Sequence, residues 1–148
     1  MRSVALVTGG TRGIGEGISR ALADAGYEVV ATGLTEAECA AFAPVPAIRT
    51  RAMDVTRDDS VMPVFAGLKR LDLLVNCAGT IQRGGREFEI EAFRQTLEVN
   101  LVGTMRCCLQ ARALLAINGG SIINTGSMLT FQGSPFVPGY SASKGGVG

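Results

Sequence analysis

Tyr140 and Lys144 stand four residues apart in the stretch GYSASKGGVG, which covers residues 139–148. If this stretch is helical, residues four apart lie on one face, so the ammonium sits one turn from the phenol. A free tyrosine titrates near pH ~10, and a nearby positive charge favours its phenolate form. Because the chain has no histidine, this pair is the candidate for acid–base chemistry at neutral pH.

A tyrosine activated in this way suits proton exchange with the oxygen of an alcohol or a ketone. Reduction of a carbonyl leaves an alkoxide, and that oxygen then needs a proton. By itself, however, a Tyr-x-x-x-Lys pair is more often a surface helix with a cation beside a ring. The elements around it must therefore show whether a binding site lies nearby.

A glycine-rich turn, TGGTRGIG at residues 8–15, is the second feature that could carry chemistry. Gly9 allows a tight turn, Gly13 lets backbone N–H groups approach a pyrophosphate, and Gly15 lets a helix pack on the preceding strand. The spacing is G-x-x-x-G-x-G rather than the general G-x-G-x-x-G, and glycines also close many ordinary turns. Its position between a first strand and a first helix favours dinucleotide binding.

Short apolar runs alternate with helical stretches along the chain. Strands are expected at 3–8, 28–32, 47–55, 71–79 and 120–127. Helices are expected at 14–25, 35–42, 60–68 and about 87–116, the last interrupted only at Gly103. Gly26 should close the first helix, and Thr35 with Glu38 predicts a capping box. The alternation predicts an α/β fold of the Rossmann type, a doubly wound parallel sheet of order 3-2-1-4-5 with helices on both faces.

The composition is that of a globular domain: 148 residues, of which 47% are hydrophobic and 18% charged, with a net charge of +1. The scattered basic residues predict neither a nucleic acid nor a membrane as partner. The four cysteines form no C-x-x-C pair and have no histidine partners, so we expect free thiols and no metal site. No signal peptide is evident in SVALVTGG and no run could span a membrane, so we expect a cytoplasmic protein.

Five motifs follow one another along the chain: TGGTRGIG, NCAG (76–79), VNLVGT (99–104), SIINTGSM (121–128) and YSASK (140–144). Ser127 also precedes Tyr140 by thirteen residues. In this order, and on these expected elements, the motifs resemble the short-chain dehydrogenase/reductase family over essentially the whole chain. The resemblance implies an NAD(P)-dependent oxidoreductase that interconverts a secondary alcohol and a ketone. It also implies a small-molecule substrate and a homo-oligomer, either a dimer or a tetramer.

The resemblance further implies roles for four catalytic residues. Tyr140 is the general acid/base, and Lys144 both assists it and binds the nicotinamide ribose. Ser127 hydrogen-bonds the substrate oxygen, and Asn100 supports a water-linked proton relay behind the lysine. Considered one by one, a serine at a strand end and an asparagine in a helix are ordinary structural residues. The complete set in family order is what favours the functional interpretation.

The same resemblance implies a set of cofactor-binding residues, with the adenine near the third strand and the nicotinamide near the fourth. They are Gly9, Thr11, Arg12, Gly13, Ile14, Gly15, Asp54, Val55, Asn76, Ala78, Gly79, Tyr140 and Lys144.

The choice between NAD and NADP depends on the end of the second strand. An acid there would bind the ribose 2′-OH and select NAD, but Gly33 occupies that position. Leu34 follows, where NADP-preferring relatives often carry arginine. Arg12 stands where the family often places a basic residue against a 2′-phosphate. The expectation is NADP or NAD, with a slight preference for NADP.

The loops resemble those of gluconate and deoxygluconate dehydrogenases, in the stretches AGTIQRGG (78–85) and SMLTFQGSPFVPGYSASK (127–144). Arg83 and Arg86 are candidates to meet a substrate carboxylate, or are simply solvated charges. A reductase of 3-oxoacyl thioesters shares much of this scaffold and is one alternative. A nucleotide-binding regulator that has lost catalysis is another.

Members of the family continue past the Tyr/Lys helix into two further strands and a substrate-covering loop. The resemblance therefore implies that residues 1–148 are a dinucleotide-binding domain that is incomplete at its C-terminus. An open edge and uncovered apolar surface are expected at the fifth strand. Either the sequence is a fragment of a longer chain, or the polypeptide ends here and is not a stable enzyme.

Overall fold

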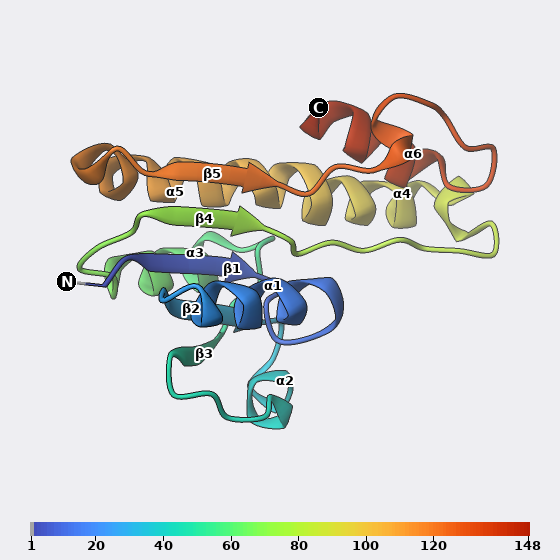
Figure 1. The fold of residues 1–148 in the computed structure, drawn as a ribbon. Helices are drawn as coiled ribbons and strands as arrows, with labels where there is room; N and C mark the ends of the chain where they lie inside the picture. The colour runs from blue at the N-terminus through green and yellow to red at the C-terminus, as the bar shows by residue number, and fades with distance from the viewer. Residues whose placement is uncertain (1) are drawn as a thin grey trace.

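A sheet of five parallel strands forms the centre of the molecule in the computed structural model, which describes residues 2–148 (Figure 1). The strands are β1 (Val4–Thr8), β2 (Glu28–Gly33), β3 (Ile48–Ala52), β4 (Leu73–Asn76) and β5 (Ser121–Asn124). Their spatial order is β3-β2-β1-β4-β5, which confirms the predicted order. In register, Leu6 of β1 is paired with Val30 on one side and Leu74 on the other.

Helices cover both faces of this sheet, as a doubly wound fold requires. The longer helices are α1 (Gly13–Asp24), α2 (Glu36–Ala41), α3 (Asp58–Ala66), α4 (Ile90–Leu97), α5 (Gly103–Asn118) and α6 (Pro138–Val147). The shorter ones are the 3-10 turns η1 (Arg86–Phe88) and η3 (Met128–Thr130) and the π turn η2 (Glu98–Val102). Helix α1 packs on β1 and β2, α5 packs on β4 and β5, and α6 packs on α4 and η3.

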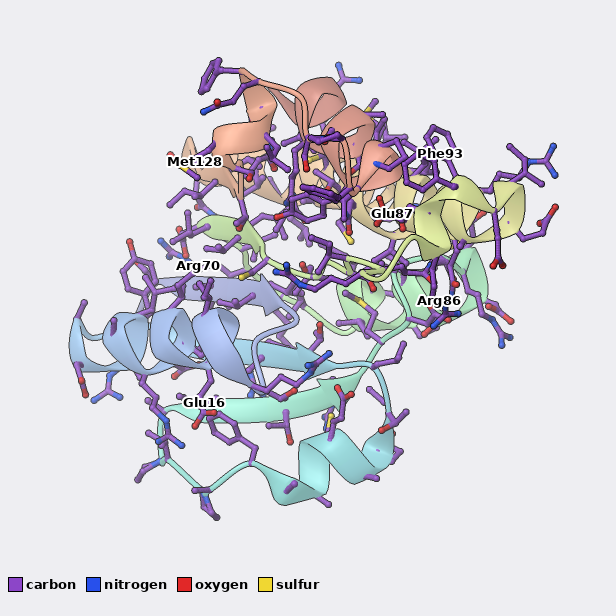
Figure 2. The ribbon with its side chains drawn as sticks, turned by 90° about the vertical axis from the view of Figure 1, so that its right-hand side faces the viewer. Glu16, Arg70, Arg86, Glu87, Phe93 and Met128 are labelled. Atoms are coloured by element: carbon purple, nitrogen blue, oxygen red, sulfur yellow. The ribbon has the colours of Figure 1, made fainter. Side chains whose placement is uncertain are left out.

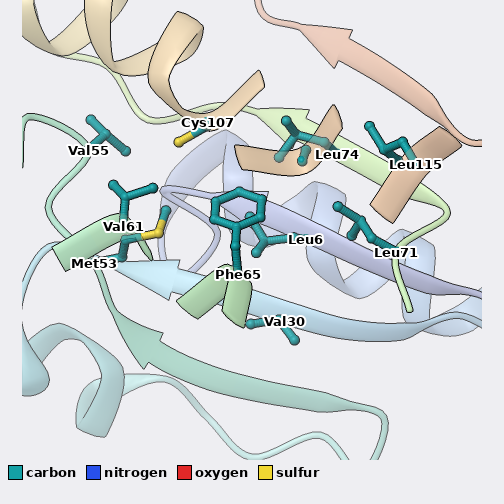
Figure 3. Close-up of a cluster of buried hydrophobic side chains, with 11 residues drawn as sticks. Leu6, Val30, Met53, Val55, Val61, Phe65, Leu71, Leu74, Cys107 and Leu115 are labelled. Carbon is teal, nitrogen blue, oxygen red and sulfur yellow. The ribbon is translucent and has the colours of Figure 1, made fainter. Parts of the chain in front are cut away.

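Two apolar clusters hold the layers together, because successive strand residues point to opposite faces. Ala5 and Val7 belong to the cluster that also includes Ile18 and Leu22 of α1. Leu6 points the other way, into a cluster with Phe65 of α3 and Leu115 of α5 (Figure 3). Burial of these side chains is the main driving force that closes the sheet between its helices.

A long helix was predicted over about residues 87–116, interrupted only at Gly103. The structure differs from this prediction in where the helix starts and in the conformation at Gly103. Glu87 lies in η1, and the extended backbone of Glu89 (φ −85°, ψ 130°) delays the start of α4 until Ile90. Gly103 is helical (φ −61°, ψ −41°) and does not interrupt the chain. A Cβ at Gly103 would lie 2.7 Å from Cγ2 of Val55, so glycine is needed here for close packing.

Other local predictions are confirmed in part. Gly26 closes α1 with a φ of +92°, and Thr35 Oγ1 caps α2 by accepting a hydrogen bond from the N–H of Glu38. The Glu38 carboxylate does not complete the box, because it accepts a hydrogen bond from the N–H of Leu34 instead. Ile14, expected on the apolar face of α1, is 73% exposed at the start of that helix.

The edge of the sheet at the fifth strand, which was expected to be uncovered, is exposed to solvent. β5 is an outer strand whose four residues are all exposed, including Ile122 and Ile123. Phe131 and Phe136, in the segment between β5 and α6, are 91% and 76% exposed. Within residues 2–148, no helix combines the length and the apolar character needed to cross a bilayer.

Candidate functional site

The turn between β1 and α1 has the backbone shape that its glycines predict. Gly9 and Gly13 have φ angles of +62° and +55°, which favour glycine. A Cβ on Gly15 would collide with the carbonyl oxygen of Gly9. Gly10, to which the sequence assigned no role, is equally restricted, since a Cβ there would lie 2.7 Å from the carbonyl oxygen of Val7. No side chain caps α1, so its first N–H groups are available to an anion.

The turn is joined directly to the segment after β4. Thr8 Oγ1 accepts hydrogen bonds from the N–H groups of Cys77 and Ala78, each at 3.0 Å. A Cβ on Gly9 would lie 2.9 Å from Cα of Ala78. The carboxyl ends of β1 and β4 therefore lie against each other, at the switch point where an open parallel sheet binds its ligand.

Lys144 is almost buried, at 6% exposure, and its position is set by two contacts. Its Nζ donates a hydrogen bond to the carbonyl oxygen of Thr125 at 2.6 Å. The same Nζ lies 5.7 Å from the centroid of the Tyr140 ring, which confirms that the two side chains share one face of α6. Burial lowers the pKa of Lys144, and this effect is partly opposed by charge at Cys77.

A continuous run of contacts leads from the glycine turn to this lysine. Gly9 lies against Ala78, as described above, and β4 ends at Asn76, which is paired with Thr8. The carbonyl oxygen of Asn76 accepts hydrogen bonds from both the N–H and the Oγ1 of Thr125. Thr125 in turn accepts the hydrogen bond from Lys144. The glycine turn and the Tyr/Lys pair, far apart in the sequence, are thus connected by direct contacts.

Asn100 lies behind this site, in the π turn η2, a kind of helix irregularity that is frequent at functional sites. Its Oδ1 accepts a hydrogen bond from the N–H of Thr80 at 2.7 Å. Its Nδ2 donates to the carbonyl oxygen of Thr80 and to Oγ of Ser143, at 2.9 and 3.0 Å. Because Ser143 precedes Lys144, Asn100 ties the segment after β4 to the Tyr/Lys helix.

Ser127 is half-buried and caps the turn η3, where its Oγ accepts a hydrogen bond from the N–H of Leu129 at 3.1 Å. Thr130 Oγ1 returns the contact by accepting from the N–H of Ser127. The turn packs against α6, so Ser127 lies on an element that contacts the Tyr140 helix.

Three buried polar atoms near the carboxyl ends of the strands could be satisfied by a polar ligand. Thr11 Oγ1, Thr32 Oγ1 and Asn76 Oδ1 are buried and have no hydrogen-bond partner among residues 2–148. Asn76 Nδ2, by contrast, is satisfied by Asn124 Oδ1 at 2.9 Å and by Cys108 Sγ at 3.3 Å. Buried polar atoms without partners are rare in native proteins, so each of these three atoms could accept a hydrogen bond from a ligand. Together with the glycine turn, they fit a dinucleotide.

The residues predicted to contact adenine lie in the loop after β3. Asp54 Oδ1 accepts hydrogen bonds from the N–H and Oγ1 of Thr56 at 2.9 and 2.7 Å. Val55 is buried against Gly103, and its carbonyl oxygen accepts from Arg106 at 2.7 Å. The loop is therefore firmly shaped by its own contacts. Gly79, predicted near the nicotinamide, is exposed beside Asn100.

Two acidic residues of the site could not be identified from local sequence. The first is Glu87, which is 1% exposed and lies between α4 and α6 (Figure 2). Its carboxylate accepts hydrogen bonds from the N–H of Gln82, Oγ1 of Thr96 and the N–H of Tyr140, at 2.9, 3.2 and 2.8 Å. Phe93 of α4 packs on the same first turn of α6, against Gly139. Glu87 therefore fixes the start of the Tyr/Lys helix.

The second is Glu38 of α2, which lies next to the expected cofactor-specificity position. One carboxylate oxygen accepts a hydrogen bond from the N–H of Leu34 at 2.9 Å. The other lies 3.8 Å from Nε of Arg12, whose side chain is 75% exposed. Its capping-box position was visible in the sequence, but the contact with Arg12 was not. Arg12 thus has an acidic partner in the structure.

Comparison with known proteins agrees with this geometry. The family model described as short chain dehydrogenase matches residues 3–148. The chain is 36% identical to a 2-dehydro-3-deoxy-D-gluconate 5-dehydrogenase of Bacillus subtilis, across 97% of this chain and 60% of that protein. It is also 36% identical to a 3-oxoacyl-[acyl-carrier-protein] reductase of Homo sapiens, across 99% of this chain and 65% of that protein. The chain therefore spans less than two thirds of these relatives.

Among solved structures, an actinorhodin polyketide ketoreductase crystallised with NADPH superposes with a TM-score of 0.89 and 31% identity. The match covers 99% of this chain and 61% of the ketoreductase. The sheet order, the glycine turn at the β1–β4 switch point and the matched family model all lead to one conclusion. The chain belongs to the short-chain dehydrogenase/reductase family.

Proposed function

We propose that residues 1–148 form the dinucleotide-binding domain of an NAD(P)-dependent oxidoreductase that interconverts a secondary alcohol and a ketone. The observation that carries the proposal is the run of contacts from Gly9 through Ala78, Asn76 and Thr125 to Lys144. This run of contacts joins a turn of the kind that binds a pyrophosphate to an acid–base pair. Family membership makes oxidoreductase chemistry the expectation for such a pair.

A nicotinamide held at this site would supply the hydride for reduction of the substrate carbon, or would accept it in oxidation. Tyr140 gives a proton to the substrate oxygen in reduction and removes it in oxidation. The Lys144 ammonium, which lies beside the Tyr140 ring, binds the nicotinamide ribose. Ser127 hydrogen-bonds the substrate oxygen. Asn100 supports a proton relay behind Lys144 and holds α6 through Ser143.

For the substrate we propose a keto or hydroxy sugar acid, or a related polyol. The loops 78–85 and 127–144 support this class, and the deoxygluconate dehydrogenase relative has a substrate of this kind in its name. Arg83 and Arg86 are exposed on the segment between β4 and α4, and no ion pair engages either of them within residues 2–148. They are available to a substrate carboxylate.

A 3-oxoacyl thioester is the second candidate, because the human relative is a reductase of that class at the same 36% identity. A catalytically inactive regulator is not favoured, since Asn100, Ser127, Tyr140 and Lys144 are all present on connected elements. For the cofactor we propose NADP or NAD with a slight preference for NADP. Arg12 and the absence of an acid at Gly33 support that preference.

If a full-length form exists, the proposal is tested by titrating that protein with NADH and NADPH and by assaying two substrate classes. Keto sugar acids are compared with 3-oxoacyl thioesters, for the parent and for Tyr140→Phe. We expect cofactor binding in both proteins, and turnover of sugar acids that falls by orders of magnitude in Tyr140→Phe. A Tyr140→Phe variant that keeps most of the turnover would show that another group is the acid.

A further inference from the structure

The end of β2 is approached by an acid from another element. Glu38 belongs to α2, yet its carboxylate accepts a hydrogen bond from the N–H of Leu34, directly after β2. A Cβ built on Gly33 would lie 3.1 Å from Cβ of Glu38 and 2.7 Å from Oγ1 of Thr11. The space in which a β2 acid would stand is therefore bordered by Glu38 on one side and by the glycine turn on the other.

In folds of this type an acid at the end of β2 binds the 2′-OH of the adenosine ribose. Arg12 and Thr11 come from the glycine turn. Gly33 ends β2 and Leu34 follows it, and the Glu38 carboxylate lies among these residues. A 2′-phosphate placed here would carry its negative charge close to that carboxylate. It would also have to compete with Glu38 for the Arg12 guanidinium, which lies 3.8 Å away.

We propose that Glu38 is a cofactor-specificity residue: it supplies from α2 the acid that β2 lacks and weakens binding of NADP relative to NAD. This inference rests on the proposed dinucleotide function. Its physical basis is twofold, since Glu38 repels the 2′-phosphate directly and occupies Arg12, the cation expected to bind it. The 2′-OH of NAD has no charge to be repelled and can donate to the carboxylate.

The other charged side chains near Glu38 do not make its contacts with Leu34 and Arg12 within residues 2–148. Glu36 is exposed on the same first turn of α2 and makes no hydrogen bond to the glycine turn or to β2 in the described part of the chain. Arg51 of β3 and Glu36 both act electrostatically on Cys39, which follows Glu38 and is buried beside Gly33. Glu36 therefore offers a matched control with equal charge but without the contact to Leu34 and Arg12.

The test compares Glu38→Gln with Glu36→Gln in the purified chain. Glutamine at position 38 keeps an oxygen that can accept from the N–H of Leu34, and both variants change the net charge equally. Dissociation constants for NAD and NADP are measured by calorimetric titration at low salt and at high salt. Thermal unfolding of each variant is recorded alongside, so that any loss of fold is detected.

We expect the ratio of NADP affinity to NAD affinity to rise about tenfold in Glu38→Gln and less than twofold in Glu36→Gln. High salt should reduce the difference, because the interaction is between partly exposed charges. If both cofactors bind but the two variants have the same ratio, the inference about Glu38 is wrong while the dinucleotide function stands. If the folded parent binds neither cofactor, the proposed function is wrong and the inference with it.

Discussion

The carboxylate of Glu87 accepts a hydrogen bond from the backbone N–H of Tyr140 at 2.8 Å, although 53 residues separate the two in sequence. The same carboxylate binds the N–H of Gln82, in the segment after β4, and Oγ1 of Thr96 in α4. One buried acid thus connects three segments around the first turn of α6. Negative charge at a helix N-terminus also interacts favourably with the helix dipole.

Glu87→Gln should destabilise the fold and loosen the surroundings of Tyr140. An amide has only one accepting oxygen, so it cannot serve the N–H of Tyr140 together with the two groups at the other carboxylate oxygen. We expect a loss of about 1.5–3 kcal/mol in the free energy of unfolding, as for a buried hydrogen bond to a charged group. Urea unfolding measures this loss.

The chain has two tyrosines and no tryptophan, so the Tyr27→Phe background leaves Tyr140 as the only source of tyrosine signal in near-ultraviolet circular dichroism. In that background Glu87→Gln should weaken the Tyr140 signal. Glu91→Gln is the control, since Glu91 is exposed and within residues 2–148 pairs only with Arg94, and it should change stability by less than about 0.5 kcal/mol. An unchanged tyrosine signal in Glu87→Gln would contradict a positioning role.

Lys144 should make stability depend on alkaline pH. Burial lowers the pKa of Lys144 below its ordinary value of 10.5 in the folded state. Between the lowered value and 10.5, the unfolded chain binds more protons than the folded one, so stability rises with pH in that window. Below it, the full cost of burying the ammonium is present. The free energy of unfolding of the parent should therefore increase relative to Lys144→Met as the pH rises toward 10.5.

The same variant should bind both cofactors more weakly, because Lys144 is proposed to hold the nicotinamide ribose common to NAD and NADP. The measurement is urea unfolding across the alkaline range together with cofactor titration at neutral pH. A stability difference between parent and Lys144→Met that does not vary with pH would show that the lysine is not buried in solution.

Two glycines of α1 should respond oppositely to alanine. A Cβ on Gly15 would collide with the carbonyl oxygen of Gly9, whereas a Cβ on Gly17 would meet nothing within 4 Å. Gly15→Ala should therefore destabilise the turn and abolish cofactor binding. Gly17→Ala should stabilise the fold by about 0.5–1 kcal/mol, since alanine is the better helix former. Stabilisation by both substitutions would mean that the turn has another shape.

Arg12→Ala should weaken NADP binding about tenfold and leave NAD binding nearly unchanged, because only NADP carries a 2′-phosphate for the guanidinium to meet. We expect the loss of NADP affinity to lie at the lower end of the range for charge-assisted hydrogen bonds, since the Arg12 side chain is largely exposed and already paired with Glu38. Titration of both cofactors at fixed salt measures the effect. Equal losses for NAD and NADP would show that Arg12 serves the conformation of the turn instead.

Replacing Gly33 by an acid would test the choice between NAD and NADP, but the substitution would also disturb the packing around this position. Any side chain there begins with a Cβ 2.7 Å from Oγ1 of Thr11 and 3.3 Å from Sγ of Cys39. A side chain at this position would therefore require neighbouring side chains to move, so glycine favours the packing here besides leaving the ribose position without an acid. The sequence could not show this, because the three residues come from separate elements.

The sequence by itself determined the order of the sheet, the shape of the glycine turn and the pairing of Tyr140 with Lys144. All three follow from local rules: the alternation of strand and helix periods, the φ angles that only glycine adopts easily, and the spacing of one helical turn. Such features need no knowledge of what lies across the molecule.

Only the tertiary structure decided which polar groups meet across long stretches of chain. Glu87 reaches Tyr140, Arg12 meets Glu38, and Gly103 is small because Val55 packs against it. From the sequence alone, Glu87 would be interpreted as a solvated acid, Arg12 as a loop cation and Gly103 as a break in a helix. Their partners are chosen by the paths of loops and by the packing of helices on the sheet, which local propensity does not encode.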